Sequence, residues 1–365
     1  PERRAAAPPA PLSLTSPGVP PEGVDVAALR PFFADHVEGA SGAPLDAELI
    51  AGGRSNLTYV IGDGAHDWVL RRPPLGHVVE TAHDMRREYR VLAGLEGSPV
   101  PVPRVLAYHG EDDLIGAPFY VMENVHGRVL RTKDEMATLT PAEARACSER
   151  LVDVLAALHS VDYQAVGLGD FGRPEGFLPR NVARWGKQWQ ANKTRELPAL
   201  DELARRLDAA LPESGPAAIV HGDYRLDNTM LAADDPGRIV AVLDWEMSTL
   251  GDPLTDVGLL LVYWGGGEQL TAVTTHEVAD IPGFLSRDEV VARYAERSGR
   301  DIQHLDFYVL FAMYKLAIIL EGINARYRLG KTLGEGFSEM GAMVDALAEQ
   351  ALVLADASED AALRA

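Results

Sequence analysis

Residues 221–256 constrain the fold more than any other stretch, because they place carboxylates directly after two short apolar runs. The stretch reads HGDYRLDNTMLAADDPGRIVAVLDWEMSTLGDPLTD. Ile219–Val220, just before it, predicts the end of a buried strand. Ile239–Leu243 predicts a second strand, which is followed at once by Asp244. We therefore expect polar side chains to leave a hairpin-like pair of segments on the same side.

Three of these side chains have a spacing that suits phosphoryl transfer. Asp223 and Asn228 lie five residues apart in one loop, and Asp244 follows Asn228 by sixteen. Phosphoryl transfer needs a carboxylate that accepts the proton of the attacking hydroxyl, and oxygen ligands for magnesium. One or two carboxylates suffice for magnesium, because phosphate oxygens and water complete its octahedron. An acidic surface loop with accidental spacing is the alternative.

The full pattern resembles one branch of the protein-kinase-like folds. His-Gly-Asp at 221–223 stands in place of His-Arg-Asp, and Asp-Trp-Glu at 244–246 stands in place of Asp-Phe-Gly. HGDxxxxN, an apolar strand and DWExxxxGDPxxD are together similar to the aminoglycoside phosphotransferase and choline kinase family. The likeness is closest to the phosphotransferase domains found fused to some acyl-CoA dehydrogenases. It covers residues 45–330, and its specific part is confined to 221–256.

The resemblance implies a role for each polar residue of this stretch. Asp223 is expected to be the general base that deprotonates the acceptor hydroxyl. Asn228 and Asp244 are expected to be the metal ligands.

Four further residues of this stretch lie next to the expected base and metal ligands in sequence or in the family's pattern. Arg225 falls where protein kinases often have a lysine near the transferred phosphoryl group, so we expect it to stabilise the transition state. A surface arginine is the alternative. His221 and Asp256 are expected to support the loop from behind. Glu246 is ambiguous between a metal-side carboxylate and a solvated one.

The chain before residue 126 predicts a sheet, and the chain after it predicts helices. Residues 48–72 alternate between apolar and polar, with a hairpin tip at Gly62–Gly64. Val102–Tyr108 and Pro118–Val125 predict two more strands. The expected fold class is α+β: a bilobal protein-kinase-like fold with a small five-stranded antiparallel N-lobe and a larger, mostly helical C-lobe.

Three segments are expected along the chain. Residues 1–21 are rich in Pro and Ala and predict a flexible N-terminal arm. Residues 22–125 are expected to form the N-lobe, and residues 126–365 the C-lobe with the catalytic and metal loops.

A Gly- and Pro-rich connector is expected at 161–181. The expected helices include Val24–His36, Arg184–Leu197, Ser286–Ser298, Asp306–Leu329 and Glu335–Leu354.

Backbone groups of two N-lobe segments are expected to contact the nucleotide. A glycine-containing loop between the first two strands would leave N–H groups free for phosphate oxygens, although an ordinary hairpin turn is the alternative. The resemblance places a hinge against the purine edge at the end of the last strand. The residues are Gly52, Gly53, Arg54, Ser55 and Asn56 in the loop, and Glu123, Asn124 and Val125 in the hinge.

The cation expected on the third strand is an arginine in this chain. Protein kinases place a lysine there and pair it with a glutamate on the following helix. No lysine precedes Lys133, and Arg71 occupies the position. Glu88 lies on an amphipathic helix and is expected to pair with Arg71; a solvent-facing charge is the alternative. Arg72 points to the opposite face, so its replacement is expected to change nucleotide affinity little.

Composition excludes some classes of partner. A formal charge of −20 argues against nucleic acid and anionic membranes, because both require a basic footprint. The most apolar run, Phe307–Leu320, contains Lys315 and is too short to span a bilayer. The single cysteine, Cys147, fits a reducing compartment, and no segment resembles a signal peptide. We expect a cytoplasmic protein.

The sequence predicts a small-molecule kinase that transfers the γ-phosphate of ATP or GTP to a substrate hydroxyl with Mg²⁺. The likeness to domains fused to acyl-CoA dehydrogenases implies a hydroxylated acyl thioester or a similar metabolite. An aminoglycoside-type phosphotransferase is an alternative, because a negative field attracts cationic acceptors. A nucleotide-binding pseudokinase or regulatory module is another; Arg71 in place of lysine favours it, whereas the intact Asp223, Asn228 and Asp244 oppose it.

The helical lobe also contains aromatic residues that would suit an apolar acceptor. The aromatic residues are Trp185, Trp189, Tyr263, Trp264, Tyr314 and Tyr327.

The sequence does not indicate an oligomeric state.

Overall fold

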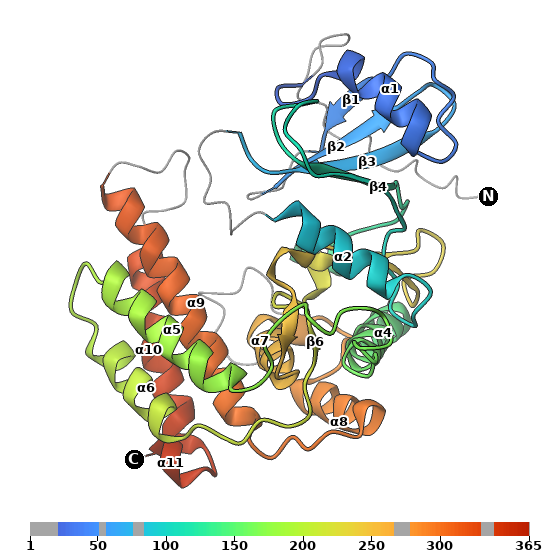
Figure 1. Cartoon of the computed structure of the whole chain (residues 1–365). Coiled ribbons are helices and arrows are strands. Elements are labelled where there is room, and N and C mark those ends of the chain that lie inside the picture. The colour runs from blue at the N-terminus through green and yellow to red at the C-terminus, as the bar shows by residue number, and fades with distance from the viewer. Residues whose placement is uncertain (1–20, 51–55, 76–83, 266–277, 330–338, 365) are drawn as a thin grey trace. The chain divides into compact units, whose positions relative to one another are not determined.

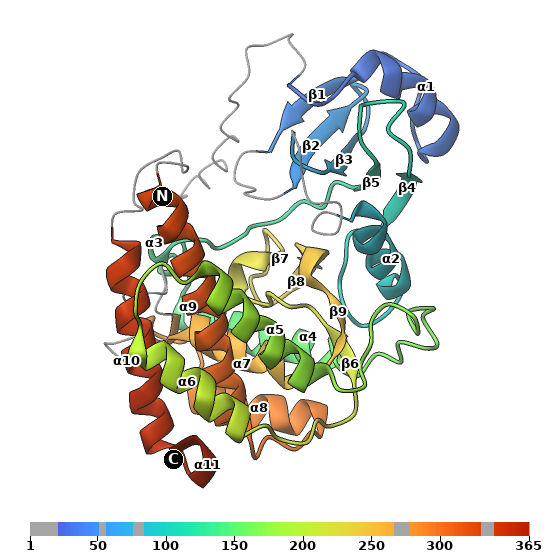
Figure 2. The same cartoon turned by 60° about the vertical axis from the view of Figure 1, so that its left-hand side comes forward.

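The computed structural model describes residues 21–50, 56–75, 84–265, 278–329 and 339–364. These residues form two compact units, whose elements are labelled in Figures 1 and 2. Unit 1 contains the described residues up to Glu96 together with Pro103–Val125. Unit 2 contains Gly97–Val102 together with the described residues from His126 onward. The arm predicted for residues 1–21 lies outside the described residues, except for Pro21.

Unit 1 is built on a five-stranded antiparallel sheet, which confirms the prediction from alternating apolar and polar residues. The strand order is β1-β2-β3-β5-β4. Between β2 and β3, Asp63 accepts hydrogen bonds from the backbone N–H groups of Ala65 and His66, and so closes the predicted hairpin. The strands are β1 (Asp46–Leu49), β2 (Leu57–Gly62), β3 (Asp67–Arg72), β4 (Val105–His109) and β5 (Phe119–Glu123).

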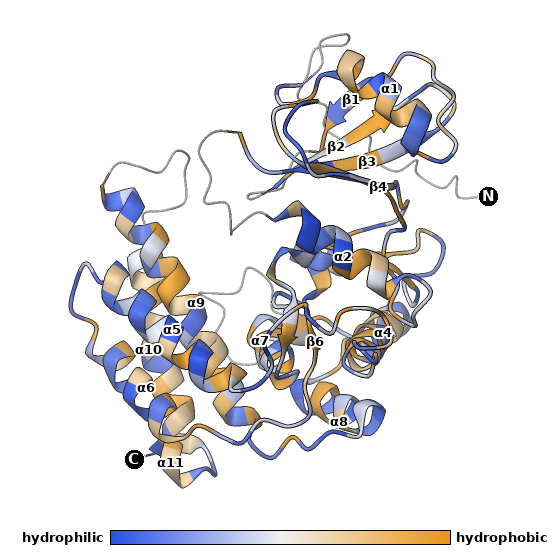
Figure 3. Ribbon diagram, in the orientation of Figure 1, coloured by the Kyte–Doolittle hydropathy of each residue, from blue (hydrophilic) through white to orange (hydrophobic). Residues whose placement is uncertain are grey.

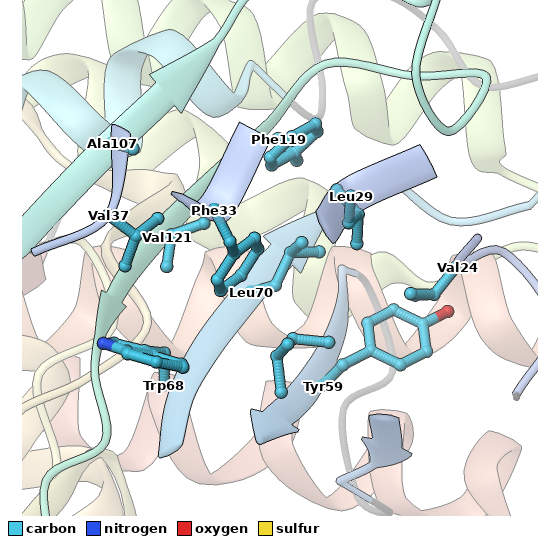
Figure 4. Close-up of a cluster of buried hydrophobic side chains, with 11 residues drawn as sticks. Val24, Leu29, Phe33, Val37, Tyr59, Trp68, Leu70, Ala107, Phe119 and Val121 are labelled. Atoms are coloured by element: carbon cyan, nitrogen blue, oxygen red, sulfur yellow. The ribbon is translucent and has the colours of Figure 1, made fainter. Parts of the chain in front are cut away.

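Helix α1 (Val26–His36) packs on one face of this sheet. Figure 4 shows the buried cluster, in which Phe33 of α1 lies near Leu70 of β3 and Val121 of β5. Side chains alternate along a strand, so Arg71 faces away from this cluster. On that other face it contacts helix α2 (Met85–Leu95).

Arg72 lies on the same face as Leu70 and is only 5% exposed. Its guanidinium donates hydrogen bonds to the backbone carbonyl oxygens of Gly23 and Ile115. Removal of this side chain would leave buried carbonyl groups without donors, so we expect Arg72 to stabilise unit 1. The small effect expected on nucleotide affinity stays a prediction.

Unit 2 is mostly helical, which confirms the predicted α+β class. Its longest described helix, α9 (Leu305–Arg328), packs against α7 and α10. Gly258 allows the close approach of α7, since a Cβ atom there would lie 2.5 Å from the backbone of Tyr308 on α9. The other helices are α3 (Lys133–Met136), α4 (Pro141–Leu158), α5 (Phe177–Asn192), α6 (Pro198–Ala209), α7 (Leu254–Trp264), α8 (Arg287–Ser298), α10 (Met340–Ala357) and α11 (Ala361–Arg364).

Helices α5, α6 and α10 carry both polar and apolar residues along their length (Figure 3). In the described parts of the chain, no helix is both long enough and apolar enough to cross a membrane.

Two small antiparallel sheets of unit 2 hold the loops of the candidate site. Strand β6 pairs with β9, and β7 pairs with β8 (Figure 2). The strands predicted at Ile219–Val220 and Ile239–Leu243 are therefore confirmed. The elements are β6 (Ala218–Val220), the 3₁₀ turn η1 (Leu226–Asn228), β7 (Thr229–Leu231), β8 (Ile239–Val242), the 3₁₀ turn η2 (Trp245–Met247) and β9 (Thr249–Gly251).

The helix boundaries differ from expectation where side-chain caps are absent. Helix α5 begins at Phe177, inside the expected connector, after a Gly176 with a left-handed φ of 63° and no side-chain cap. Helix α6 was not predicted; Leu197 precedes it and also forms no cap. By contrast, Ser286 and Glu289 form a capping box, and α8 begins where the sequence predicts it.

Candidate active site

The loop after β6 begins with a histidine whose two ring nitrogens have fixed roles. His221 is fully buried. Its Nε2–H donates to the carbonyl oxygen of Leu243, 2.9 Å away, and its Nδ1 accepts from the backbone N–H of Asp223 at 3.3 Å. His221 therefore joins the loop that carries Asp223 to the segment that ends in Asp244.

Asp256 of α7 holds the same loop from its other side. Its side chain is 1% exposed. Oδ2 accepts the backbone N–H of His221 at 2.7 Å, and Oδ1 accepts the backbone N–H of Gly222 at 2.8 Å. His159, which ends α4, lies with Nε2 3.3 Å from Oδ2. One carboxylate thus binds two successive backbone donors and a histidine.

The charges of this buried pair follow from its partners. Burial alone raises the pKa of Asp256, but the hydrogen bonds from His159 and the loop outweigh it, so the pKa is lowered and the carboxylate is ionised. Burial lowers the pKa of His159, which is therefore neutral. Its Nε2–H donates to Asp256, and its Nδ1 accepts from the hydroxyl of Tyr294 at 2.8 Å.

Asp223 and Asn228 contact each other within the loop. Asn228 Nδ2 lies 2.8 Å from the backbone oxygen of Asp223 and 2.9 Å from its Oδ2. Both neighbours are acceptors, so the amide NH₂ must face them, and the Asn228 Oδ1 atom is directed elsewhere. Burial raises the pKa of Asp223, against the opposing charge of Arg225, and this makes the carboxylate a stronger base.

Arg225 lies between two carboxylates and an aromatic ring. Its Nε is 3.5 Å from Asp223 Oδ2, and one terminal nitrogen is 3.0 Å from Asp227 Oδ2. The guanidinium carbon lies 4.8 Å from the ring centroid of Tyr263 on α7. Burial raises the pKa of Tyr263 to about 12, so its ring stays neutral. The sequence predicts Tyr263 only as one of the aromatic residues that would suit an apolar acceptor. Its contact with Arg225 depends on packing, which no local pattern indicates.

Asp244 follows β8 in an unusual backbone conformation. Among the described residues it is the only non-glycine residue with a positive φ, at 64°. Such a conformation costs about 1–3 kcal/mol and is frequent at functional sites. The backbone N–H of Leu243 donates to the carbonyl oxygen of Asn228 at 2.8 Å, which brings the two predicted metal ligands to neighbouring positions. Glu246 lies in η2 and is partly exposed.

The donor set fits magnesium. No group of three or more His, Cys, Asp or Glu side chains suited to a metal occurs in the part of the chain that the structure describes. A magnesium site in a phosphotransferase does not need such a group, because it uses one or two carboxylates together with phosphate and water oxygens. Asp244 and the Oδ1 atom of Asn228 are donors of this kind.

In unit 1, Arg71 and Glu88 form the expected ion pair. Arg71 Nε lies 3.0 Å from Glu88 Oε2, and Glu88 is 1% exposed, so the alternative of a solvent-facing charge is wrong. Tyr120 donates its hydroxyl to Oε2 at 2.9 Å, and Asn56 donates its side-chain amide to Oε1. The sequence did not single out Tyr120, whose contact requires the pairing of β5 with β3.

The other predicted nucleotide contacts are only partly within the described residues. Gly52, Gly53, Arg54 and Ser55 lie outside them. At the predicted hinge, Glu123 accepts the backbone N–H of Arg104 at 2.9 Å, and Asn124 donates to Asp67 at 2.8 Å. Val125 is the last residue of unit 1. These side chains are engaged locally, and the backbone contacts with a purine stay a prediction.

The aromatic residues expected to offer acceptor surface divide into two groups. Trp189, Trp264 and Tyr314 are at most 1% exposed and belong to the core of unit 2, so the expectation is wrong for them. Trp185 and Tyr263 are partly exposed, and Tyr327 is exposed.

A comparison with known sequences identifies relatives. The sequence pattern of the phosphotransferase enzyme family matches residues 46–306. Acyl-CoA dehydrogenase family member 11 of Rattus norvegicus is 33% identical over 343 residues, which are 92% of this chain and 44% of that protein. This chain therefore spans less than half the length of that relative.

A comparison with solved structures points to the same family. A putative aminoglycoside phosphotransferase from Ralstonia eutropha has a TM-score of 0.77 at 35% identity, covering 90% of this chain and 98% of that chain. A thermostable mutant of aminoglycoside phosphotransferase APH(4)-Ia, in complex with AMP-PNP and hygromycin B, has a TM-score of 0.58 at 17% identity, covering 89% and 97%, which is a likeness of fold. This chain belongs to the phosphotransferase enzyme family.

Proposed function

We propose that this phosphotransferase is a kinase that transfers the γ-phosphoryl group of ATP or GTP, with Mg²⁺, to the hydroxyl of a small metabolite. The observation that carries the proposal is the arrangement around Asn228. Its amide NH₂ is bound to Asp223, its carbonyl oxygen faces elsewhere, and its backbone is bound to the residue before Asp244. The proposed base and the two proposed metal ligands are thus linked through these hydrogen bonds.

Asp223 would accept the proton of the attacking hydroxyl. Burial favours this role because it raises the pKa of the carboxyl group, and a general base works best when its pKa approaches the operating pH. Arg225 opposes the shift and keeps the carboxylate charged. The same guanidinium would lie near negative charge that develops during transfer.

Asn228 Oδ1 and Asp244 would hold the magnesium ion. When bound, the ion supplies charge neutralisation to the phosphate oxygens. Asp256 would act as a positioning residue, because it fixes the backbone of His221 and Gly222 next to the base.

Arg71 would contact the α- and β-phosphates in place of the usual lysine. A guanidinium can bind one anion through two donors and still contact a second. Glu88 orients Arg71 and is itself held by Asn56 and Tyr120.

The acceptor is proposed from the relatives. The rat relative is named as an acyl-CoA dehydrogenase family member, which favours a hydroxylated acyl thioester or a similar metabolite. Hygromycin B is bound in the APH(4)-Ia complex, so an aminoglycoside acceptor is a second candidate. A pseudokinase, which would phosphorylate no acceptor, is the remaining alternative, and only the arginine at position 71 favours it.

Asp223→Asn is expected to reduce turnover by about 10²–10⁴-fold, the usual contribution of a general base. Nucleotide affinity should be nearly unchanged, because Asp223 is assigned to the acceptor. The measurement is steady-state ADP formation with an acceptor panel, beside calorimetric titration of the nucleotide. Asp208→Asn, the same change on an exposed residue of α6, is the control. Turnover of Asp223→Asn at the wild-type rate would disprove the assignment.

Asp256→Asn is expected to lower the free energy of unfolding by about 1–3 kcal/mol, because an amide NH₂ would face one of three buried donors. We also expect turnover to fall by about 10²-fold, the scale of a 1 Å misplacement, with the nucleotide KM unchanged. Urea denaturation and steady-state kinetics measure the two effects. A variant that is less stable but fully active would show that Asp256 supports only the fold.

Arg71→Ala is expected to weaken nucleotide binding by about 1–3 kcal/mol, the scale of a lost charged hydrogen bond. Arg71→Lys should restore part of this, because an ammonium group is a single point charge. Calorimetric titration measures both. Arg86→Ala, on an exposed position of α2, is the control, since Arg72 is structural. Equal affinities for wild type and Arg71→Ala would contradict the role of Arg71.

A further inference from the structure

A group of cations and aromatic rings on α5 and α9 has no role in the mechanism above. Lys315 of α9 lies with Nζ 5.8 Å from the ring centroid of Trp185 on α5, and 6.0 Å from that of Phe311. The guanidinium carbon of Arg184 lies 5.4 Å from the same Trp185 ring. Two positive charges therefore share one indole ring, an arrangement that costs repulsion unless an anion joins it.

Lys315 lies in an otherwise apolar part of α9. Its sequence neighbours Tyr314 and Leu316 are both buried. Among the residues that the structure describes, no carboxylate lies within 4.0 Å of Lys315 Nζ, and the ammonium donates no hydrogen bond. A charge that is buried away from water is costly without a partner of opposite charge, so this ammonium is suited to bind an anion from outside the chain.

The indole N–H of this same Trp185 ring is a second donor. Its Nε1 atom is buried and has no hydrogen-bond acceptor within the described ranges. Buried polar groups are nearly always paired in folded proteins. Both Lys315 and Trp185 can only donate, so the group that satisfies them must be an acceptor.

This cluster lies within electrostatic reach of the proposed base. Burial lowers the pKa of Lys315, while the negative charges of Asp256 and Asp223 raise it and Arg184 lowers it further. Helix α9 packs against both α5 and α7, and α7 carries Tyr263, which contacts Arg225. A small molecule bound to Lys315 could therefore extend to Asp223.

We propose that the phosphate acceptor is a hydroxylated anion, and that Lys315 Nζ and the indole N–H of Trp185 bind its carboxylate or phosphate group while its hydroxyl reaches Asp223. Arg184 adds positive potential at the same place. A polycationic aminoglycoside would be repelled here, in spite of the net charge of −20 for the whole chain. The inference rests on the proposed kinase function and narrows its substrate class.

The test compares acceptors that differ only in charge. One set is a hydroxycarboxylate, its neutral amide and the corresponding amino alcohol. The other is a hydroxyacyl thioester of coenzyme A, which carries phosphates, beside the same acyl group on neutral N-acetylcysteamine. Wild type is expected to phosphorylate the anionic member of at least one set about 10- to 100-fold more efficiently than its neutral partner, the scale of one charged hydrogen bond. The set that responds identifies carboxylate or phosphate as the source.

Lys315→Met removes the charge with little change of size. It is expected to raise the KM of the anionic acceptor about 10- to 100-fold and to leave the KM values of the neutral acceptor and the nucleotide unchanged. Lys315→Arg should retain part of the preference. Lys187→Met, the same change on an exposed residue of α5, is the control and should retain all of it.

Two results would overturn the inference. The first is that the wild-type enzyme phosphorylates neutral or cationic acceptors as efficiently as anionic ones. The second is that Lys315→Met raises the KM of anionic and neutral acceptors by the same factor. If wild type transfers phosphate to no acceptor, the kinase proposal fails. Calorimetric titration of the same anions then decides this inference: binding that Lys315→Met abolishes supports it, and no binding by wild type refutes it.

Discussion

The rest of the site depends on one buried carboxylate, that of Asp256. It is 1% exposed and binds the backbone N–H groups of His221 and Gly222 together with His159. Buried donors without an acceptor are costly, so the loop after β6 can keep its shape only while this carboxylate is ionised and in place. Helix α7, which carries Asp256, is thereby bound to the backbone of the loop that carries Asp223.

Two further contacts extend this control to the proposed metal ligands. His221 binds the carbonyl oxygen of Leu243, and Leu243 donates its own N–H to Asn228. The residue that follows, Asp244, adopts a left-handed conformation, whose cost must be met by the packing around it. The backbones that carry the proposed base and both proposed metal ligands are therefore joined by main-chain hydrogen bonds, and we expect little backbone rearrangement when substrates bind.

The sequence predicts the fold well where local pattern decides structure, and poorly where packing decides it. Alternation located the strands of unit 1, and the capping box of Ser286 located α8. The spacing of Asp223, Asn228 and Asp244 indicated the chemistry. Helix α6 was missed because it has no side-chain cap, and the contacts of Tyr120 with Glu88 and of Lys315 with Trp185 join elements distant in sequence. No local pattern encodes such contacts.

The most direct test of the central claim is a crystal structure with Mn²⁺ in place of Mg²⁺ and a non-hydrolysable ATP analogue. We expect an anomalous peak about 2.1 Å, the distance typical of magnesium, from both Asn228 Oδ1 and an Asp244 oxygen, with the γ-phosphorus facing Asp223. A nucleotide whose metal ion is bound by other residues, with Asn228 and Asp244 uncoordinated, would contradict the account.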